Sequence, residues 1–445
     1  MSTRPTRRAV LSTGIATATA ALAGGCAMGG TGGGASRDLG GGKKDGGGKV
    51  SGKITVWSWD VAANALKRLA RTFEKRHPGT TVAVTDIGYD NAADKMTVGL
   101  RGGSGLADVL TIGGNQLPRY AGNFPQGFYD LGSLGGRYGG DFDRASWRTV
   151  TGPGHEVFGL PWDIGPCALY YRKDHFRAAG VDPRALLTWD DYVAAGVRVK
   201  KATGHKLLIM DTTNTGILPL LLQQQGQAYF KDGRVAVDSP EAVKALTLMK
   251  ALHDRGLVDY EKGWSGLVTG TKEGKASTTP TAAWWTGTLT DEMPELKGRF
   301  GVVPLPGFTA DGPRTSNEGG STLCVPAQSK NPELAWAFIE FVLTDRANQV
   351  SMLKQEGLFP AYLPALDDPY VGAGQEYFGG QRVLDLFAGL ARTIPPVEYT
   401  KDDAKAVDIM VAAVTGVTLR GKDPRASLES AARQIAAATG RERMK

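Results

Sequence analysis

The residues best suited to chemistry lie in one short segment, Gly159 to Asp174, which places an indole beside a carboxylate at Trp162 and Asp163. Pro161 precedes this pair, and Gly165 and Pro166 follow shortly after it. Proline restricts the backbone dihedral angles and glycine widens their allowed range. We therefore expect Trp162 and Asp163 to lie outside a regular element, on a turn that a ligand can reach. The alternative is an ordinary turn whose tryptophan packs inward.

Further candidate side chains follow the predicted strands in the first third of the chain. Strand-like runs at 54–57, 81–85 and 107–112 alternate with amphipathic helical patterns at 62–75 and 92–100. This order predicts a β-α-β-α-β unit, and parallel sheets of this kind bind ligands in the crevice at the carboxyl ends of their strands. The polar and aromatic residues expected at that edge are Trp59, Asp60, Asn115 and Gln116.

Two later segments offer similar residue types. A predicted strand at 207–210 is followed by Thr213 and Asn214, which are either site residues or a plain cluster at the start of a helix. Trp284 and Trp285 end an alanine-rich, strand-like run. Because adjacent residues of a strand point to opposite faces, at most one of these two tryptophans should enter a site, and the sequence does not say which.

The segment before the predicted strand at 322–326 adds a carboxylate and glycines. Gly319 permits close approach of the backbone to a ligand. Glu318 is a candidate carboxylate contact, although an exposed loop acid explains it equally well.

Four stretches in order carry a resemblance to a known family. They are ITVWSWD at 54–60, the segment 159–174, AAWWT at 282–286 followed by FGVVPLP at 300–306, and the run 319–341. Together they resemble the extracellular solute-binding proteins of carbohydrate-uptake ABC transporters, of the maltose-binding-protein type. The match covers nearly all of the chain after residue 50.

The resemblance implies an α/β architecture with a two-lobed periplasmic-binding-protein-like (type II) fold, in which central mixed sheets are flanked by helices and a hinge joins the lobes. One lobe is expected at 50–162 with 303–355 returning to it, and the other at 163–302 with 356–445 completing it. Hinge bending is expected where the chain crosses between lobes, near Pro161 to Pro166, Val302 to Pro306 and Leu358 to Tyr362.

The resemblance also implies the function. The protein is expected to be a monomer that captures a sugar between its lobes, a di- or oligosaccharide, and delivers it to ABC transporter permease subunits, with no catalysis and no cofactor. Thr213 and Asn214 would face the cleft, Trp284 or Trp285 would stack on a sugar ring, and Phe359 would line the site.

The candidate residue types suit such a ligand. Pyranose rings present apolar C–H faces and a rim of hydroxyls, so indole faces supply apolar contact and Asp, Asn and Gln supply fixed hydrogen-bonding groups. Charged acceptors make the stronger hydrogen bonds, which favours Asp60 and Asp163 as orienting contacts. Two alternatives remain: a binder of a non-sugar solute on the same scaffold, and a secreted glycoside hydrolase whose two acids flank the scissile bond.

The first 49 residues predict export and anchoring. Thr6 to Leu11 resembles a twin-arginine motif, and the short apolar run through Leu22 is typical of a signal peptide ending at residue 25. Ala23 to Cys26 resembles a lipobox, with its usual leucine displaced to Leu22, so Cys26 is expected to be lipidated and to hold the protein at the outer face of the cytoplasmic membrane. The Gly-rich residues 26–49 are expected to form a flexible tether.

Charge and cysteine usage exclude other classes. The net charge is +7, and removal of residues 1–25 would leave about +4, without the clustered Lys/Arg of a nucleic-acid module. Cys167 and Cys324 sit in apolar, strand-like contexts that favour two buried thiols over a disulfide. The five histidines are isolated in the sequence, so no metal site is expected.

Overall fold

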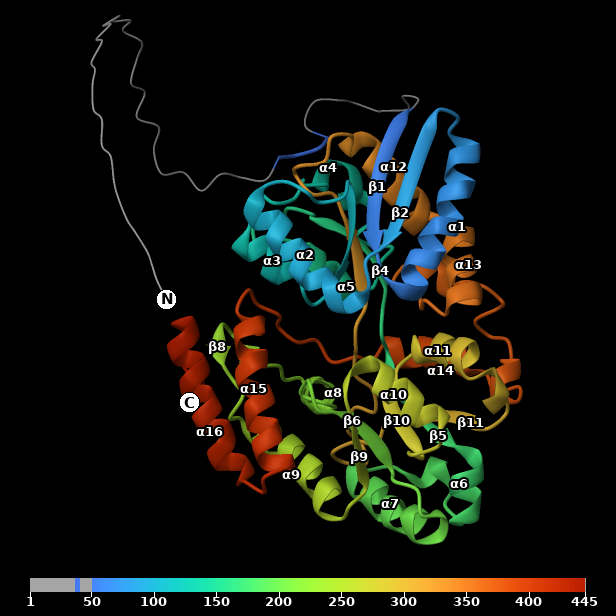
Figure 1. The fold of residues 1–445 in the computed structure, drawn as a ribbon, viewed down its shortest axis with the longest axis vertical. Helices are drawn as coiled ribbons and strands as arrows, with labels where there is room; N and C mark the ends of the chain where they lie inside the picture. Colours follow the sequence, from blue (N-terminus) through green and yellow to red (C-terminus); the bar gives the residue numbers. More distant parts are fainter. Residues whose placement is uncertain (1–36, 41–49, 445) are drawn as a thin grey trace, which may run out of the picture. The chain divides into compact units, whose positions relative to one another are not determined.

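The computed structural model describes residues 37–40 and 50–444, and these described residues belong to one compact unit. The signal peptide, Cys26 and most of the expected tether lie outside the described residues. The fold is a two-lobed α/β fold built around two main sheets, as predicted (Figure 1). We call the part around the five-stranded sheet lobe 1 and the part around the three-stranded sheet lobe 2.

The sheet of lobe 1 has the order β2-β1-β3-β12-β4. Its strands are β1 Gly52–Ser58, β2 Thr80–Asp86, β3 Val109–Gly113, β4 Gly159–Asp163 and β12 Ser321–Cys324. β1 pairs in parallel with β2 and β3, whereas β12 runs antiparallel to β3 and β4. The predicted β-α-β-α-β opening is thereby confirmed, with boundaries shifted by one to three residues.

Helices cover this sheet through apolar stripes that the sequence made visible. In α1 (Asp60–Arg76) the predicted stripe of Ala62, Leu66, Leu69, Ala70 and Phe73 is buried. The other helices of lobe 1 are α2 Tyr89–Gly102, α3 Leu117–Asn123, α4 Gly132–Gly135, α5 Arg144–Val150, α12 Pro332–Thr344 and α13 Arg346–Glu356. Phe338 of α12 meets Phe73 edge to face, with ring centroids 5.4 Å apart, a spacing typical of aromatic pairs.

Lobe 2 is centred on the antiparallel sheet β10-β5-β11, with β5 Cys167–Arg172 between β10 Thr278–Ala282 and β11 Phe300–Pro304. A parallel pair, β6 Leu208–Asp211 and β9 Val258–Glu261, and a short hairpin, β7 Phe230–Lys231 and β8 Arg234–Val235, complete its strands. Its helices are α6 Lys173–Ala178, α7 Trp189–Thr203, α8 Leu218–Gln224, α9 Pro240–Asp254, α10 Gly263–Lys272, α11 Trp285–Glu292, α14 Val383–Ala391, α15 Asp403–Thr418 and α16 Pro424–Thr439.

The chain segments that cross between the two sheets are hydrogen-bonded to one another. The Glu318 amide donates to the Gly165 carbonyl at 2.8 Å, which joins the crossing after β4 to the crossing before β12. The Ile164 amide donates to the Phe359 carbonyl at 2.9 Å, which adds the third crossing. Trp162 and Asp163 end strand β4, so the prediction that this pair lies outside a regular element is wrong. Pro161 is tolerated there because β4 is the edge strand of the sheet.

The two described cysteines are free and buried, Cys167 on β5 and Cys324 on β12. Burial raises the pKa of both thiols. Within residues 37–40 and 50–444, no helix is long and apolar enough to cross a membrane. The same residues hold no cluster of His, Cys, Asp or Glu that could bind a metal ion.

Candidate functional site

The loop after β6 is organised by one carboxylate, Asp211. Its Oδ1 accepts from the Thr213 hydroxyl at 2.7 Å, and its Oδ2 accepts from the Asn214 side-chain amide at 2.7 Å. The Gly263 amide, at the start of α10, donates to the same Oδ1 at 2.9 Å. Thr213 and Asn214 are exposed. Because Asp211 bonds to both residues and to the start of α10, it fixes their positions relative to α10.

Three tryptophans of lobe 2 form a cluster beside this loop. The ring of Trp264, on α10, lies 5.6 Å from that of Trp284 and 5.5 Å from that of Trp285, centroid to centroid. Trp264 is 45% exposed and Trp284 is half-buried, whereas Trp285 is fully buried. Trp284 is thus the member of the predicted pair that a ligand can reach.

The reason for this outcome differs from the predicted one. β10 ends at Ala282, Trp284 caps the amino terminus of α11 and Trp285 is the first residue of that helix. The two side chains diverge because they sit at a helix start, and not because they alternate along a strand. Among the residues that the structure describes, none is a hydrogen-bond partner of the buried Trp285 indole N–H.

Glu318 lies on the crossing before β12 and links this cluster to lobe 1. The Trp284 indole Nε1 donates to the Glu318 main-chain carbonyl at 2.9 Å, and the Thr281 hydroxyl donates to its carboxylate Oε2 at 2.7 Å. Glu318 keeps an accessible surface, while desolvation by the surrounding protein raises the pKa of its carboxyl and the Thr281 hydrogen bond opposes that rise.

The glycines after Glu318 have backbone conformations that a side chain would disfavour. Gly319 has φ +83° and Gly320 has φ +92°. A Cβ on Gly319 would lie 3.3 Å from Trp284 Nε1, and one on Gly320 would lie 2.9 Å from the Asp163 carbonyl oxygen. These glycines let the segment lie close to Trp284 and to the end of β4, and the predicted approach of a ligand to this backbone stays a prediction.

Gly320 connects the cluster to the end of β3. Its carbonyl accepts from the Gly114 amide at 2.9 Å, and Asn115 and Gln116 follow directly. Asn115 is exposed, and Gln116 is half-buried at the amino terminus of α3. A continuous series of contacts thus runs from Asn214, through the tryptophans and Glu318, to Asn115.

Trp59 and Asp60 lie at the carboxyl end of β1, on the same edge of the sheet. The Trp59 ring meets that of exposed Tyr89 edge to face, with centroids 5.5 Å apart. Asp60 is exposed and has φ +45°, an uncommon conformation for a residue other than glycine. Backbone strain of this kind gathers at functional sites. Within the described contacts, the Ser58–Thr111 hydroxyl bond of 2.9 Å ties this strand end to β3.

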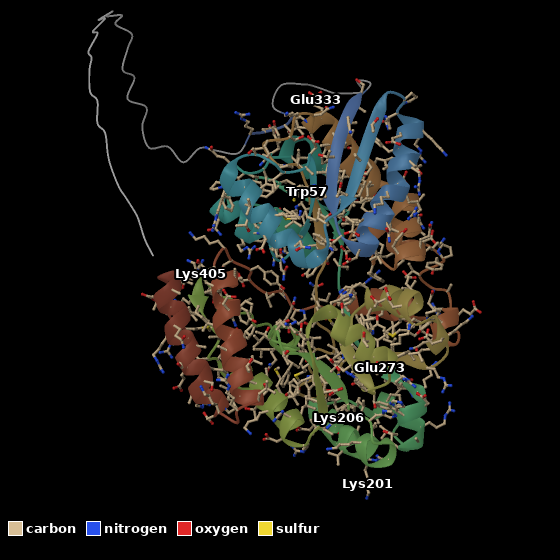
Figure 2. The ribbon with its side chains drawn as sticks, in the orientation of Figure 1. Trp57, Lys201, Lys206, Glu273, Glu333 and Lys405 are labelled. Atoms are coloured by element: carbon tan, nitrogen blue, oxygen red, sulfur yellow. The ribbon has the colours of Figure 1, made fainter. Side chains whose placement is uncertain are left out.

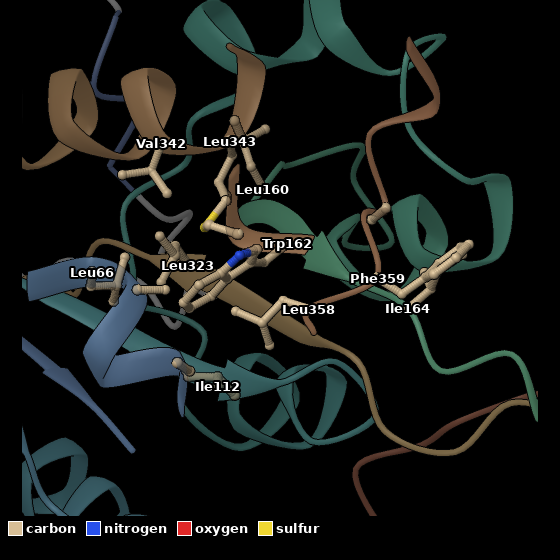
Figure 3. Packing of buried hydrophobic residues seen from close by; sticks show 14 of the residues in the cluster. Leu66, Ile112, Leu160, Trp162, Ile164, Leu323, Val342, Leu343, Leu358 and Phe359 are labelled. Atoms are coloured by element: carbon tan, nitrogen blue, oxygen red, sulfur yellow. The ribbon is translucent and has the colours of Figure 1, made fainter. Parts of the chain in front are cut away.

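Trp162, Asp163 and Phe359 are placed differently from the prediction. Trp162 and Phe359 are fully buried, and Figure 3 shows the Trp162 indole packed among leucines of lobe 1, including Leu323 and Leu358. Asp163 is 6% exposed, and its carboxylate accepts from the amide and the hydroxyl of Ser321. Burial raises the pKa of Asp163. In this conformation the Asp163 carboxylate bonds β4 to the start of β12, while the Trp162 and Phe359 side chains are packed in the hydrophobic core. Their contact with a ligand stays a prediction.

Sequence reasoning missed Trp264, Asp211 and Asn317. Asp211 ends β6, at the strand predicted at 207–210, but only the next residues, Thr213 and Asn214, are predicted site residues. Trp264 follows β9, a strand that was not predicted. Asn317 accepts from the Gly165 amide at 3.0 Å through its side chain, a contact between distant segments that no local pattern indicates.

The family follows from comparison with known proteins. Residues 57–349 match the model of the bacterial extracellular solute-binding proteins. The chain belongs to this family. The resemblance inferred from the four sequence stretches is confirmed, and members of the family are binding proteins of the cell exterior.

Similar solute-binding proteins include a lactose-binding protein of Rhizobium radiobacter, 28% identical over 78% of this chain and 84% of that protein. An arabinooligosaccharide-binding protein of Bacillus subtilis is 25% identical over 87% of this chain and 94% of its own. The solved structure of an ABC transporter associated binding protein from B. animalis subsp. lactis, in complex with β-1,6-galactobiose, has a TM-score of 0.77 at 23% identity and covers 87% of this chain and 98% of its own. This last likeness supports the fold of this solute-binding protein.

Proposed function

We propose that this solute-binding protein captures a carbohydrate, a di- or oligosaccharide, at the surface formed by Trp264, Trp284 and Glu318. The observation that carries the proposal is the accessible pair of indoles beside Glu318. The main-chain carbonyl of Glu318 accepts from the Trp284 indole N–H, and its carboxylate accepts from the Thr281 hydroxyl. Indole faces suit the C–H faces of a sugar ring, and the carboxylate is a strong acceptor for its hydroxyls.

Polar and aromatic residues on either side of the tryptophans and Glu318 supply further contacts for the sugar. Thr213 and Asn214 approach from lobe 2, and Asn115, Gln116, Trp59 and Asp60 from lobe 1. The named ligands of the similar proteins, lactose, arabino-oligosaccharides and β-1,6-galactobiose, support a ligand of two or more rings.

The proposed mechanism is a shift of population between open and closed forms. Bending takes place at the hydrogen-bonded crossings at Gly165, Glu318 and Phe359, and a sugar that contacts both lobes stabilises the closed form. Glu318 replaces the expected crossing at Val302 to Pro306, because Val302 to Pro304 pair with β5 inside the sheet of lobe 2. The closed monomer is recognised by the membrane subunits of an ABC transporter. No bond of the sugar is made or broken, and lipid on Cys26 keeps the protein at the outer face of the cytoplasmic membrane.

Isothermal titration calorimetry tests this proposal on the chain that begins after Cys26. The panel contains lactose, arabino-oligosaccharides, β-1,6-galactobiose, an amino acid and a polyamine, and each bound sugar is recovered and analysed. We expect micromolar or tighter binding of one carbohydrate that is recovered intact. A cleaved sugar would instead identify a hydrolase, and binding of only the amino acid or polyamine would overturn the choice of ligand.

A further inference from the structure

Four residues within the Gly-rich amino-terminal segment are attached to lobe 1. Asp38 forms a parallel bridge with Asp130: the Leu39 amide donates to the Asp130 carbonyl at 2.9 Å, and the Asp130 amide donates to the Arg37 carbonyl at 2.8 Å. Figure 1 shows this short blue segment next to α4. The expected tether is therefore not a free coil at residues 37–40.

Side chains add to the backbone pairing. The Ser133 hydroxyl donates to Asp38 Oδ1 at 2.6 Å, and the Gly40 amide donates to the same oxygen at 3.0 Å. Leu39 is half-buried against the core of lobe 1, and it is the one large apolar side chain between residues 29 and 49. A Cβ on Gly40 would lie 2.0 Å from Ser133 Oγ, so the segment approaches α4 as closely as a glycine permits.

The receiving residues are themselves fixed. Asp130 Oδ1 accepts from the Gly132 amide at 2.8 Å and from the Val157 amide at 2.9 Å, and the Tyr129 amide donates to the Val325 carbonyl at 2.9 Å. Val325 follows the end of β12, the end where Cys324 pairs with Gly159. This end is opposite to the one where Ser321 pairs with Gly113, beside the candidate site.

We propose that Arg37–Gly40 is a clip that fastens the amino-terminal segment to lobe 1. A lipid anchor at Cys26 is then connected to the folded protein at residue 37 and not at residue 50. The 11 residues from Cys26 to Arg37 span at most about 40 Å when fully extended, whereas the 24 residues to Val50 would span at most about 85 Å. The clip roughly halves the reach of the anchored protein.

The clip itself does not depend on ligand binding, and only its effect on reach rests on the proposed lipidation of Cys26. Its test therefore uses neither a sugar nor a membrane. Failure of the proposed sugar binding or anchoring would leave the result of this test unchanged.

Hydrogen exchange on the chain that begins after Cys26 tests the clip. We expect peptides covering Leu39 and Asp130 to be protected at least tenfold relative to an unstructured peptide. Gly40→Val, which collides with Ser133, should remove protection at the Leu39 peptide and at the Asp130 amide, which donates to Arg37, while the Tyr129 and Leu131 amides, β12 and β4 stay protected. Gly47→Val makes the same chemical change outside the clip and should alter neither peptide.

A distance measurement provides a second readout. Nitroxide labels on Arg37→Cys and Arg144→Cys, both exposed positions, should give a narrow distance distribution in electron double resonance, and Gly40→Val should broaden it. Native cysteines 167 and 324 are buried and should stay unlabelled. Rapid exchange at Leu39 in the unmodified chain, or a broad distribution before Gly40→Val is introduced, would overturn the clip.

Discussion

The indole N–H of Trp284 donates to the main-chain carbonyl of Glu318 at 2.9 Å. This bond joins the start of α11 in lobe 2 to the crossing that leads into β12. It sets the orientation of an accessible indole next to a carboxylate before any ligand arrives. Preorganisation of this kind reduces the ordering cost that binding must overcome.

Replacement of Trp284 should weaken sugar binding. Trp284→Ala removes the indole face and its bond to the crossing, and we expect Kd to rise at least tenfold, which corresponds to about 1.4 kcal/mol. Calorimetry with the carbohydrate that binds in the titration panel measures the effect. Trp57→Ala is the matched control, because Trp57 lies on the side of lobe 1 covered by α2, under Lys95 (Figure 2). Equal affinities for both variants would remove Trp284 from the site.

Sugar binding should depend on pH through Glu318. Desolvation raises the pKa of this carboxyl above its ordinary value of 4.5, so the carboxylate acceptor is lost as pH falls through the raised value. Kd should increase in that range. Ionisation of Glu318 is less favourable in the folded chain than in the unfolded chain, because its pKa is raised on folding. The contribution of Glu318 to the free energy of unfolding therefore falls as pH rises from 4.5 through the raised pKa, whereas sugar binding strengthens over the same range.

Glu318→Gln isolates this effect, since it keeps the shape of the side chain and removes the titration. Kd of the variant at neutral pH should resemble that of the unmodified protein at low pH. Its profile between pH 4 and 8 should be flatter than that of the unmodified protein. Parallel profiles would assign the pH dependence to another group, of which Asp163 is a candidate through its own raised pKa.

Trp162→Ala should chiefly lower stability. From the sequence, Trp162 was expected on a turn that a ligand can reach, where its loss would impair binding and not stability. Because Trp162 is fully buried in the core of lobe 1, its truncation should cost about 3 to 5 kcal/mol of unfolding free energy. Denaturant unfolding measures this value, and Trp162→Phe should cost less. A variant with unaltered unfolding would contradict the observed packing.

Gly165→Ala should disturb the paired crossings. A Cβ at this position would lie 1.9 Å from the Glu318 carbonyl oxygen, which also accepts from Trp284. We expect a loss of about 1 to 3 kcal/mol in stability from the forced shift, together with weaker sugar binding. Gly389→Ala in α14 is the control, because nothing lies within 4 Å of an added Cβ there, and it should be neutral or slightly stabilising.

The candidate site was predictable from the sequence where a local rule applied. Asn115 and Asp60 were found because they follow strands with clear alternation or burial patterns, and the structure places both exposed at the expected edge. Trp264 follows β9 in the same way and was overlooked because the short strand β9 was not predicted. Asn317 could not have been found, since its partner Gly165 is distant in the sequence.

The sequence by itself determined the order of strands and helices in lobe 1 and the family, because hydrophobic periodicity and short motifs act over a few residues. Only the tertiary structure decided that Trp284 is accessible while Trp162 and Trp285 are buried, since exposure depends on what distant segments pack against each indole. The same holds for Leu39 and Gly40. Their composition predicts a flexible tether, and contact with Asp130 and Ser133, about ninety residues away in the chain, holds them on lobe 1.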